Sequence, residues 1–165
     1  MSAVDAELLG FLLDRYAAPL ELYAAQWCRF PEDVVQEAFI ELVRQPMRPE
    51  HVVSWLYRVV RNGAISAARS GNRRRKREQA IAGTSETWFV SKPDSTIDAA
   101  IASEALRSLP TEQREVIVAR IWGELTFEEI AEIAEISSST AHRRYAAGLA
   151  TLRERLGLTW LTKNS

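Results

Sequence analysis

The sequence predicts an all-α protein in which two small helical domains are joined by a flexible linker, the C-terminal one containing a helix-turn-helix. Apolar residues recur every three or four positions through most of the 165 residues, and no alternating pattern is long enough for a strand. The periodicity is lost between Glu78 and Asp94, where Gly, Ser, Thr and Pro are frequent. We therefore expect a first domain at 1–77, a linker at 78–95 and a second domain at 96–165.

The first domain is expected to contain four helices. The first helix has one apolar stripe, formed by Leu8, Leu9, Leu12, Leu13 and Tyr16. Proline is favoured in the first turn of a helix, so Pro19 is expected to begin the second one. The apolar face of this second helix would consist of Leu20, Tyr23, Ala24 and Trp27.

Pro31 is expected to begin the third helix, whose inward positions are Val34, Val35, Ala38, Phe39 and Leu42. Pro46 and Pro49 would end it and form a short stiff loop. The fourth helix is expected to begin near Glu50 and to run into a cluster of basic residues at 69–77. Its apolar positions are Val52, Val53, Leu56, Val59, Val60 and Ile65.

An apolar patch, Trp88-Phe89-Val90, interrupts the polar linker. It either docks on a neighbouring domain or contacts a partner. Helical spacing resumes after the linker with Ile97, Ile101, Ala105 and Leu109, and a further helix carries Val116, Ile117, Ala119 and Ile121.

The last third of the chain has the pattern of a helix-turn-helix. Thr126 and Glu129 form a capping box at the start of one helix, after Gly123 has ended the preceding one. Serines at 137–139 supply the N-cap of the next helix. That helix carries polar and basic residues suited to phosphates and base edges: Ser138, Ser139, Thr140, His142, Arg143 and Arg144. The pattern predicts a DNA-binding helix, and the alternative is a solvated basic face.

The net charge of −1 conceals two separate basic regions. Residues 69–77 contain six Arg or Lys and no acid, and residues 138–165 contain five basic residues and one glutamate. Two basic faces on a nearly neutral chain indicate two separate DNA contacts rather than nonspecific electrostatic binding.

The chain offers little for catalysis or cofactor binding. Asp33, Gln36 and Glu37 share an exposed helix face, but no nucleophile or metal-binding histidine accompanies them, so we interpret this face as a docking surface. Cys28 is the only cysteine, which excludes an internal disulfide and a zinc cluster, and we expect it to be a small core residue. No metal or cofactor is expected. Because no leader or membrane-spanning stretch is found, the protein is expected to be cytoplasmic.

The fourth helix is a second candidate DNA contact. Arg58, Arg61, Asn62 and Arg69 recur on roughly one side, and Arg73 and Arg74 continue the basic run. Trp55 and Tyr57 either stack on unpaired bases or belong to the core.

These motifs together resemble the extracytoplasmic-function (ECF) group of bacterial RNA polymerase sigma factors. The resemblance is carried by Asp33-Val-Val-Gln-Glu-Ala-Phe, by Trp55-Leu-Tyr-Arg-Val-Val-Arg-Asn, by Leu109-Pro-Thr-Glu-Gln-Arg-Glu-Val and by the helix-turn-helix, in that order. It covers residues 5–158. The protein is thus expected to be a non-enzymatic factor that binds core RNA polymerase and directs it to promoters.

The resemblance implies a role for each motif. Asp33, Gln36 and Glu37 would dock on the clamp of the largest polymerase subunit, and the second domain would contact the flap of the second subunit. The loop from Gln45 to Ser54 and the fourth helix would recognise and melt the −10 element, which assigns to it Arg58, Arg61, Asn62, Arg69, Arg73 and Arg74. Residues 138–144 would bind the −35 element. Whether an anti-sigma factor controls the protein is left open.

The chain departs from the family pattern at several places. Ser66 stands where an acid is frequent, and the loop containing Pro46 and Pro49 is short. His142 occupies a position where lysine is common, and Arg143 one where a small residue is common. The alternatives are a stand-alone helix-turn-helix regulator that binds duplex DNA without polymerase, a recombinase with a similar DNA-binding tail, and a module that sequesters another sigma factor.

Overall fold

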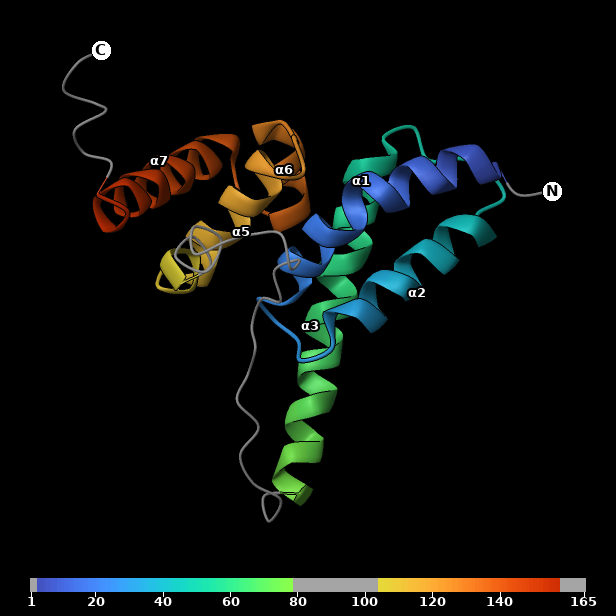
Figure 1. Ribbon diagram of the computed structural model, residues 1–165, viewed down its shortest axis with the longest axis horizontal. Coiled ribbons are helices and arrows are strands. Elements are labelled where there is room, and N and C mark those ends of the chain that lie inside the picture. The colour runs from blue at the N-terminus through green and yellow to red at the C-terminus, as the bar shows by residue number, and fades with distance from the viewer. Residues whose placement is uncertain (1–2, 79–103, 158–165) are drawn as a thin grey trace. The chain divides into compact units, whose positions relative to one another are not determined.

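The computed structural model describes residues 3–78 and 104–157, with the backbone alone for 72–78. The chain divides into two compact units, residues 1–88 and 89–165. The described residues form helices and no strand, as Figure 1 shows, which confirms the all-α prediction. The expected linker beyond Glu78, the Trp88-Phe89-Val90 patch and the positions Ile97 and Ile101 lie outside the described residues.

The first unit begins with a single long helix, α1 (Ala6–Ala24), capped by the Asp5 carboxylate, which accepts the Leu8 N–H at 2.7 Å. The prediction that Pro19 begins a second helix was wrong, because Pro19 lies inside α1. A proline there removes one backbone hydrogen bond and crowds the preceding turn. Burial of Leu12, Tyr16 and Leu20, which lie four residues apart on one face, opposes that cost and carries the helix through.

Helices α2 (Pro31–Arg44) and α3 (Val52–Glu78) complete the unit, and each of the three helices packs against the other two (Figure 1). Pro31 stands in the first turn of α2, as expected, and α2 ends before Gln45 and Pro46. The core between the helices contains large side chains with no more than 1% exposure: Leu20, Tyr23, Leu42, Leu56, Tyr57 and Val60. Burying one such side chain stabilises the fold by about 1.5–3 kcal/mol.

Tyr57 belongs to this core, so its suggested role in stacking on unpaired bases was wrong. Its side chain is fully buried, and its ring meets the Tyr23 ring at 4.9 Å in an edge-on arrangement. Burial raises the pKa of Tyr57 far above its ordinary value. Its hydroxyl oxygen has no hydrogen-bond partner among the described residues. Trp55, two residues earlier, is half-buried.

We expect Tyr57→Phe to raise the free energy of unfolding by about 1 kcal/mol, because it keeps the ring and removes a buried hydroxyl that lacks a partner. Urea unfolding followed by circular dichroism measures the change. Tyr16→Phe is the matched control: the Tyr16 hydroxyl accepts a hydrogen bond from Arg15 Nε at 3.4 Å, so no gain is expected there. A loss of stability in Tyr57→Phe would contradict the prediction.

The second unit contains α5 (Thr111–Ile121), α6 (Phe127–Ala134) and α7 (Ser138–Arg155), and residues 104–107 are also helical. Helices α5 and α7 pack closely where Gly148 of α7 meets Ile117 of α5. A Cβ at this position would clash with the Ile117 δ-methyl and would stand 3.4 Å from Gln113 Cβ. The absence of a side chain at Gly148 therefore sets how closely the two helices approach.

The helix-turn-helix is present, with both predicted caps. The Thr126 hydroxyl accepts the Glu129 N–H at 3.1 Å, while the Glu129 carboxylate accepts the Thr126 N–H at 3.0 Å. The Ser137 hydroxyl accepts the Thr140 N–H at 3.1 Å and begins α7. The expectation for Gly123 needs correction, since α5 ends at Ile121 and Glu124 is the residue with a positive φ, 56°.

The turn between α6 and α7 depends on Glu135, which has a left-handed backbone with φ 58° and ψ 45°. The next amide, that of Ile136, bonds back to the Ala131 carbonyl at 2.9 Å and closes the end of α6. Residues with a Cβ are strained in this conformation, and glycine is the usual occupant. The turn is thus made here with a local energetic cost.

Replacing Glu135 by glycine is expected to raise the free energy of unfolding by about 0.5–1 kcal/mol, because the strain of a left-handed residue with a Cβ disappears. The matched control is Glu132→Gly, in the interior of α6, which should lower stability by about 1 kcal/mol. Denaturant unfolding compares the two variants. Equal losses in both would show that Glu135 is not strained.

Within residues 3–78 and 104–157, no helix is long and apolar enough to cross a lipid bilayer.

Candidate nucleic-acid interface and docking face

The solvent-facing side of α7 carries the residues predicted to contact DNA. Ser139, His142 and Arg143 are exposed, whereas Ser138, Thr140 and Arg144 are half-buried along its flanks. The exposed side continues with alanines, at 146, 147 and 150. Arg153, Glu154 and Arg155 follow at its C-terminal end, so polar side chains stand at both ends of this side. Those of the first turns lie where a helix that enters the major groove contacts base edges.

Thr140 has a structural task in addition to its predicted one. Its hydroxyl accepts hydrogen bonds from the Ser137 hydroxyl at 2.8 Å and from Arg143 Nη2 at 3.4 Å. The α7 cap thus also orients the Arg143 guanidinium. Of the predicted residues on this helix, Ser139, His142 and Arg143 are the ones that the fold presents most openly.

The structure adds Phe127, a residue that the sequence analysis did not single out. Its ring lies against the His142 imidazole with the ring centroids 3.7 Å apart and the planes at 31°. Tyr145 meets the same ring edge-on at 5.4 Å, and the Arg120 guanidinium lies over it at 4.5 Å. Phe127 therefore links α5, α6 and α7, a role that its position after a capping residue does not reveal.

The three predicted docking residues of α2 are all exposed, but they border two different depressions. Asp33 and Glu37 line a furrow between α2 and α3, together with Glu41 and Asn62. Gln36 lies on the other side of α2 and lines a groove between α2 and α1. The predicted docking face is thus the outward ridge of α2, with an acidic side and an apolar side.

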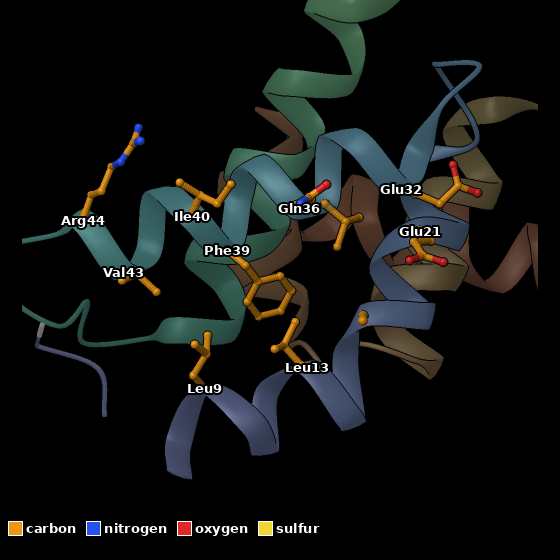
Figure 2. Close-up of a pocket in the computed structure, with 11 residues that line it drawn as sticks. Leu9, Leu13, Glu21, Glu32, Gln36, Phe39, Ile40, Val43 and Arg44 are labelled. Atoms are coloured by element: carbon orange, nitrogen blue, oxygen red, sulfur yellow. The ribbon is translucent and has the colours of Figure 1, made fainter. Parts of the chain in front are cut away.

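The groove between α1 and α2 has a volume of about 440 Å³ and is mostly apolar. Figure 2 shows Leu9 and Leu13 of α1 opposite Phe39 and Val43 of α2, and Ile40 also lines the groove. Charged side chains stand at its ends, with Glu21 and Glu32 at one and Arg44 at the other, and burial with repulsion from Glu32 raises the pKa of Glu21. The sequence did contain an indication of this groove, because the predicted apolar stripe of α1 has more leucines than the core uses. Leu13, for example, is 40% exposed.

On α3, Arg58, Asn62 and Arg69 are exposed along one side. Arg61 is half-buried, with its guanidinium 5.5 Å from the centre of the Trp27 ring. Arg73 and Arg74 lie on the helical backbone of α3, but their side chains are outside the described part. Because the carboxylates of Asp33 and Glu37 line the same furrow as Asn62, that amide suits a base edge better than a phosphate.

The loop between α2 and α3 carries Met47, which at 79% is the most exposed large apolar side chain of the described residues. Its neighbours Pro46 and Arg48 are also exposed. The loop predicted to face the −10 element therefore presents an apolar tip and a cation to solvent.

Cys28 is half-buried rather than a full core residue, and its thiol donates to the Ala24 carbonyl at 3.4 Å. Burial raises its pKa to about 11, so the thiol is protonated and unreactive at neutral pH. Among the described residues, no cluster of three or more His, Cys, Asp or Glu side chains is arranged to hold a metal ion.

A helix-turn-helix with a basic outer face, preceded by a three-helix unit with a basic third helix, defines a two-domain DNA-binding protein. Comparison with known proteins makes the class more specific. Residues 12–75 match the family model "Sigma-70 region 2", and residues 105–154 match "Sigma-70, region 4". The chain belongs to the ECF group of RNA polymerase sigma factors, so it is a transcription initiation factor and not an enzyme.

Two relatives are similar over most of their length. The ECF RNA polymerase sigma factor SigL of Mycobacterium tuberculosis is 29% identical over 173 residues, which covers 96% of both chains. The RNA polymerase sigma factor SigV of Bacillus subtilis is 30% identical over 127 residues, covering 75% of this chain and 74% of the relative.

Two solved structures share the fold. The sigma factor RpoE of Bartonella quintana, in complex with the anti-sigma factor NepR, has a TM-score of 0.70 at 20% identity and covers 91% of this chain and 97% of its own. CnrH in complex with the cytosolic domain of CnrY has a TM-score of 0.59 at 21% identity, covering 94% and 91%. The sequence-based prediction of an ECF sigma factor that directs RNA polymerase to promoters is confirmed.

Proposed function

We propose that this sigma factor docks on core RNA polymerase through the α2 ridge, opens the promoter −10 element with α3 and its preceding loop, and binds the −35 element through α7. The observation that carries this assignment is the exposure of three separate polar faces, each opposite a buried core. In this arrangement Asp33, Gln36 and Glu37 meet the clamp of the largest subunit, and the second unit contacts the flap of the second subunit.

The charges of the exposed surfaces support the assignment of one surface to a protein partner and of two others to DNA. Acids line the α2 side of the furrow, so this side repels DNA phosphates and suits a basic protein surface. The exposed arginines of α3 and α7 suit DNA instead. Extruding a base costs a few kcal/mol, and contacts that hold the unpaired base offset that cost. Docking of both units on one polymerase raises their effective concentration at the promoter.

We place the protein in the cytoplasm, where the polymerase and the promoters are. An anti-sigma factor is a further proposed partner, because the RpoE structure that shares this fold is a complex with one. A stand-alone helix-turn-helix regulator is the alternative. It would use α7 in the same way but would leave the exposed α2 ridge and the exposed side of α3 without a role.

Reversing two charges on the ridge, Asp33→Lys with Glu37→Lys, is expected to weaken binding to core polymerase at least about tenfold, because like charges brought together at an interface cost several kcal/mol. Both side chains are exposed, so the fold should persist. Fluorescence anisotropy of the labelled protein with purified core enzyme measures the affinity, and circular dichroism checks the fold.

Asp14→Lys serves as the control for this experiment, since Asp14 is an exposed acid of α1 outside both depressions. Gln36→Lys, on the apolar side of the ridge, tests whether that side also contacts the core polymerase. Unchanged affinity in the double variant would remove the docking assignment. Tight, specific promoter binding by the isolated chain would favour the stand-alone regulator.

For the −35 element, Arg143→Ala is expected to lower transcription from a promoter that depends on it and to reduce the slope of log affinity against log salt by about 1, because one phosphate contact is lost. Reconstituted holoenzyme and a matched promoter with a scrambled −35 element provide the comparison. Arg153→Ala, an exposed arginine near the end of α7, is the control. Equal effects of the two substitutions would contradict a contact at the start of α7.

A further inference from the structure

His142 differs from its neighbours on the exposed side of α7 because its ring is held from one side. The imidazole is exposed, yet it lies 3.7 Å from the Phe127 ring, centre to centre, with the planes only 31° apart. Neither ring nitrogen has a hydrogen-bond partner among the described residues. A ring that is packed through its face keeps its nitrogen-bearing edge available, because hydrogen bonds to imidazole form in the ring plane.

Phe127 is itself firmly placed. It directly follows the N-cap Thr126, whose reciprocal bonds with Glu129 fix the first turn of α6. The Arg120 guanidinium lies over its ring at 4.5 Å, and Arg120 Nη1 also donates to the Leu125 carbonyl at 2.8 Å. The ring against which His142 packs therefore has contacts that do not depend on His142.

We propose that Phe127 is a positioning residue that holds the His142 imidazole edge toward the major groove, so that His142 discriminates between bases of the −35 element. This inference rests on the proposed function of α7. A neutral imidazole offers one donor and one acceptor in a fixed plane, and base edges in the major groove differ in their pattern of donors and acceptors. A ring with one orientation can distinguish these patterns, whereas a freely rotating side chain does so less well.

The other exposed residues of α7 leave much of the base discrimination to His142. Between the first turns of α7 and Arg153 near its end, the outward residues are Ala146, Ala147 and Ala150, which carry no polar side-chain group. Arg143 is exposed too, but its guanidinium reaches the Thr140 hydroxyl and carries a charge that suits phosphates. Base discrimination by α7 is thus left to few side chains, and His142 is the one whose ring plane is set by a neighbour.

The test measures base preference with the reconstituted holoenzyme on a pool of promoters in which the −35 element is randomised. His142→Ala should reduce the preference at one or two adjacent base pairs by roughly threefold to tenfold, the value of one hydrogen bond. Phe127→Leu, which keeps an apolar side chain but removes the flat ring, should reduce the preference at the same base pairs by a smaller factor. Phe127→Tyr, which retains the ring, should keep the base preference of the wild-type protein.

Two controls separate positioning from general weakening of the fold. Ile133→Val removes a buried methyl group of α6 that is not part of the His142 contact, so it should lower stability without changing the pattern of base preference. In the wild-type protein, the His142 ring protons should show the upfield NMR shift of protons lying over an aromatic face. The NMR measurement does not depend on any variant folding.

The inference is overturned if His142→Ala weakens all promoters equally, if Phe127→Leu changes preference at base pairs that His142→Ala leaves alone, or if the His142 protons show no ring-current shift. A decrease of the salt slope in His142→Ala would instead identify a phosphate contact and would also overturn it. Failure of the proposed function looks different, because Arg143→Ala and a scrambled −35 element would then both leave transcription unchanged.

Discussion

Each helix that presents a candidate DNA contact is held by the burial of its opposite side, and the rest of the structure depends on this constraint. In α3, Leu56, Tyr57, Val60 and Ala64 have no exposed surface, while Arg58 and Asn62 face solvent. In α7, Ala141 and Gly148 are buried against the other helices of the unit. A helix gains most of its stability from such packing, so the exposed side is left to function.

The two units bury the inner sides of these helices in different ways. The first unit packs large side chains, including two fully buried tyrosines, between three long helices. The second unit packs aliphatic side chains such as Val116, Ile117 and Ile130, and α5 and α7 approach closely because position 148 is a glycine. Its short α6 is held at both ends, by the capping box at Thr126 and by the left-handed turn at Glu135. Strain in that turn is tolerated because the turn aims α7, and the buried face of α6 stabilises the arrangement.

The arrangement of charge keeps the proposed roles apart. The furrow between α2 and α3 combines acids of one helix with the uncharged Asn62, Ser66 and Ser70 of the other. The groove on the far side of α2 is apolar between charged ends. A single helix, α2, thus separates two chemically different depressions, and its ridge offers a protein partner both acidic and apolar contacts.

The sequence by itself determined the helical class, the helix-turn-helix with its two caps, and the family. These depend on local spacing and hydrogen bonds between residues three or four apart, such as Thr126 with Glu129, which a linear pattern records. Tertiary structure decided the rest: that α1 continues through Pro19, that Tyr57 is core, that Gln36 and Glu37 border different depressions, and that Phe127 packs on His142. In each case the outcome depends on a residue of another helix, or on burial between helices that outweighs a local preference. The sequence alone did not decide these points, because periodicity along one helix carries no information about the neighbouring helix.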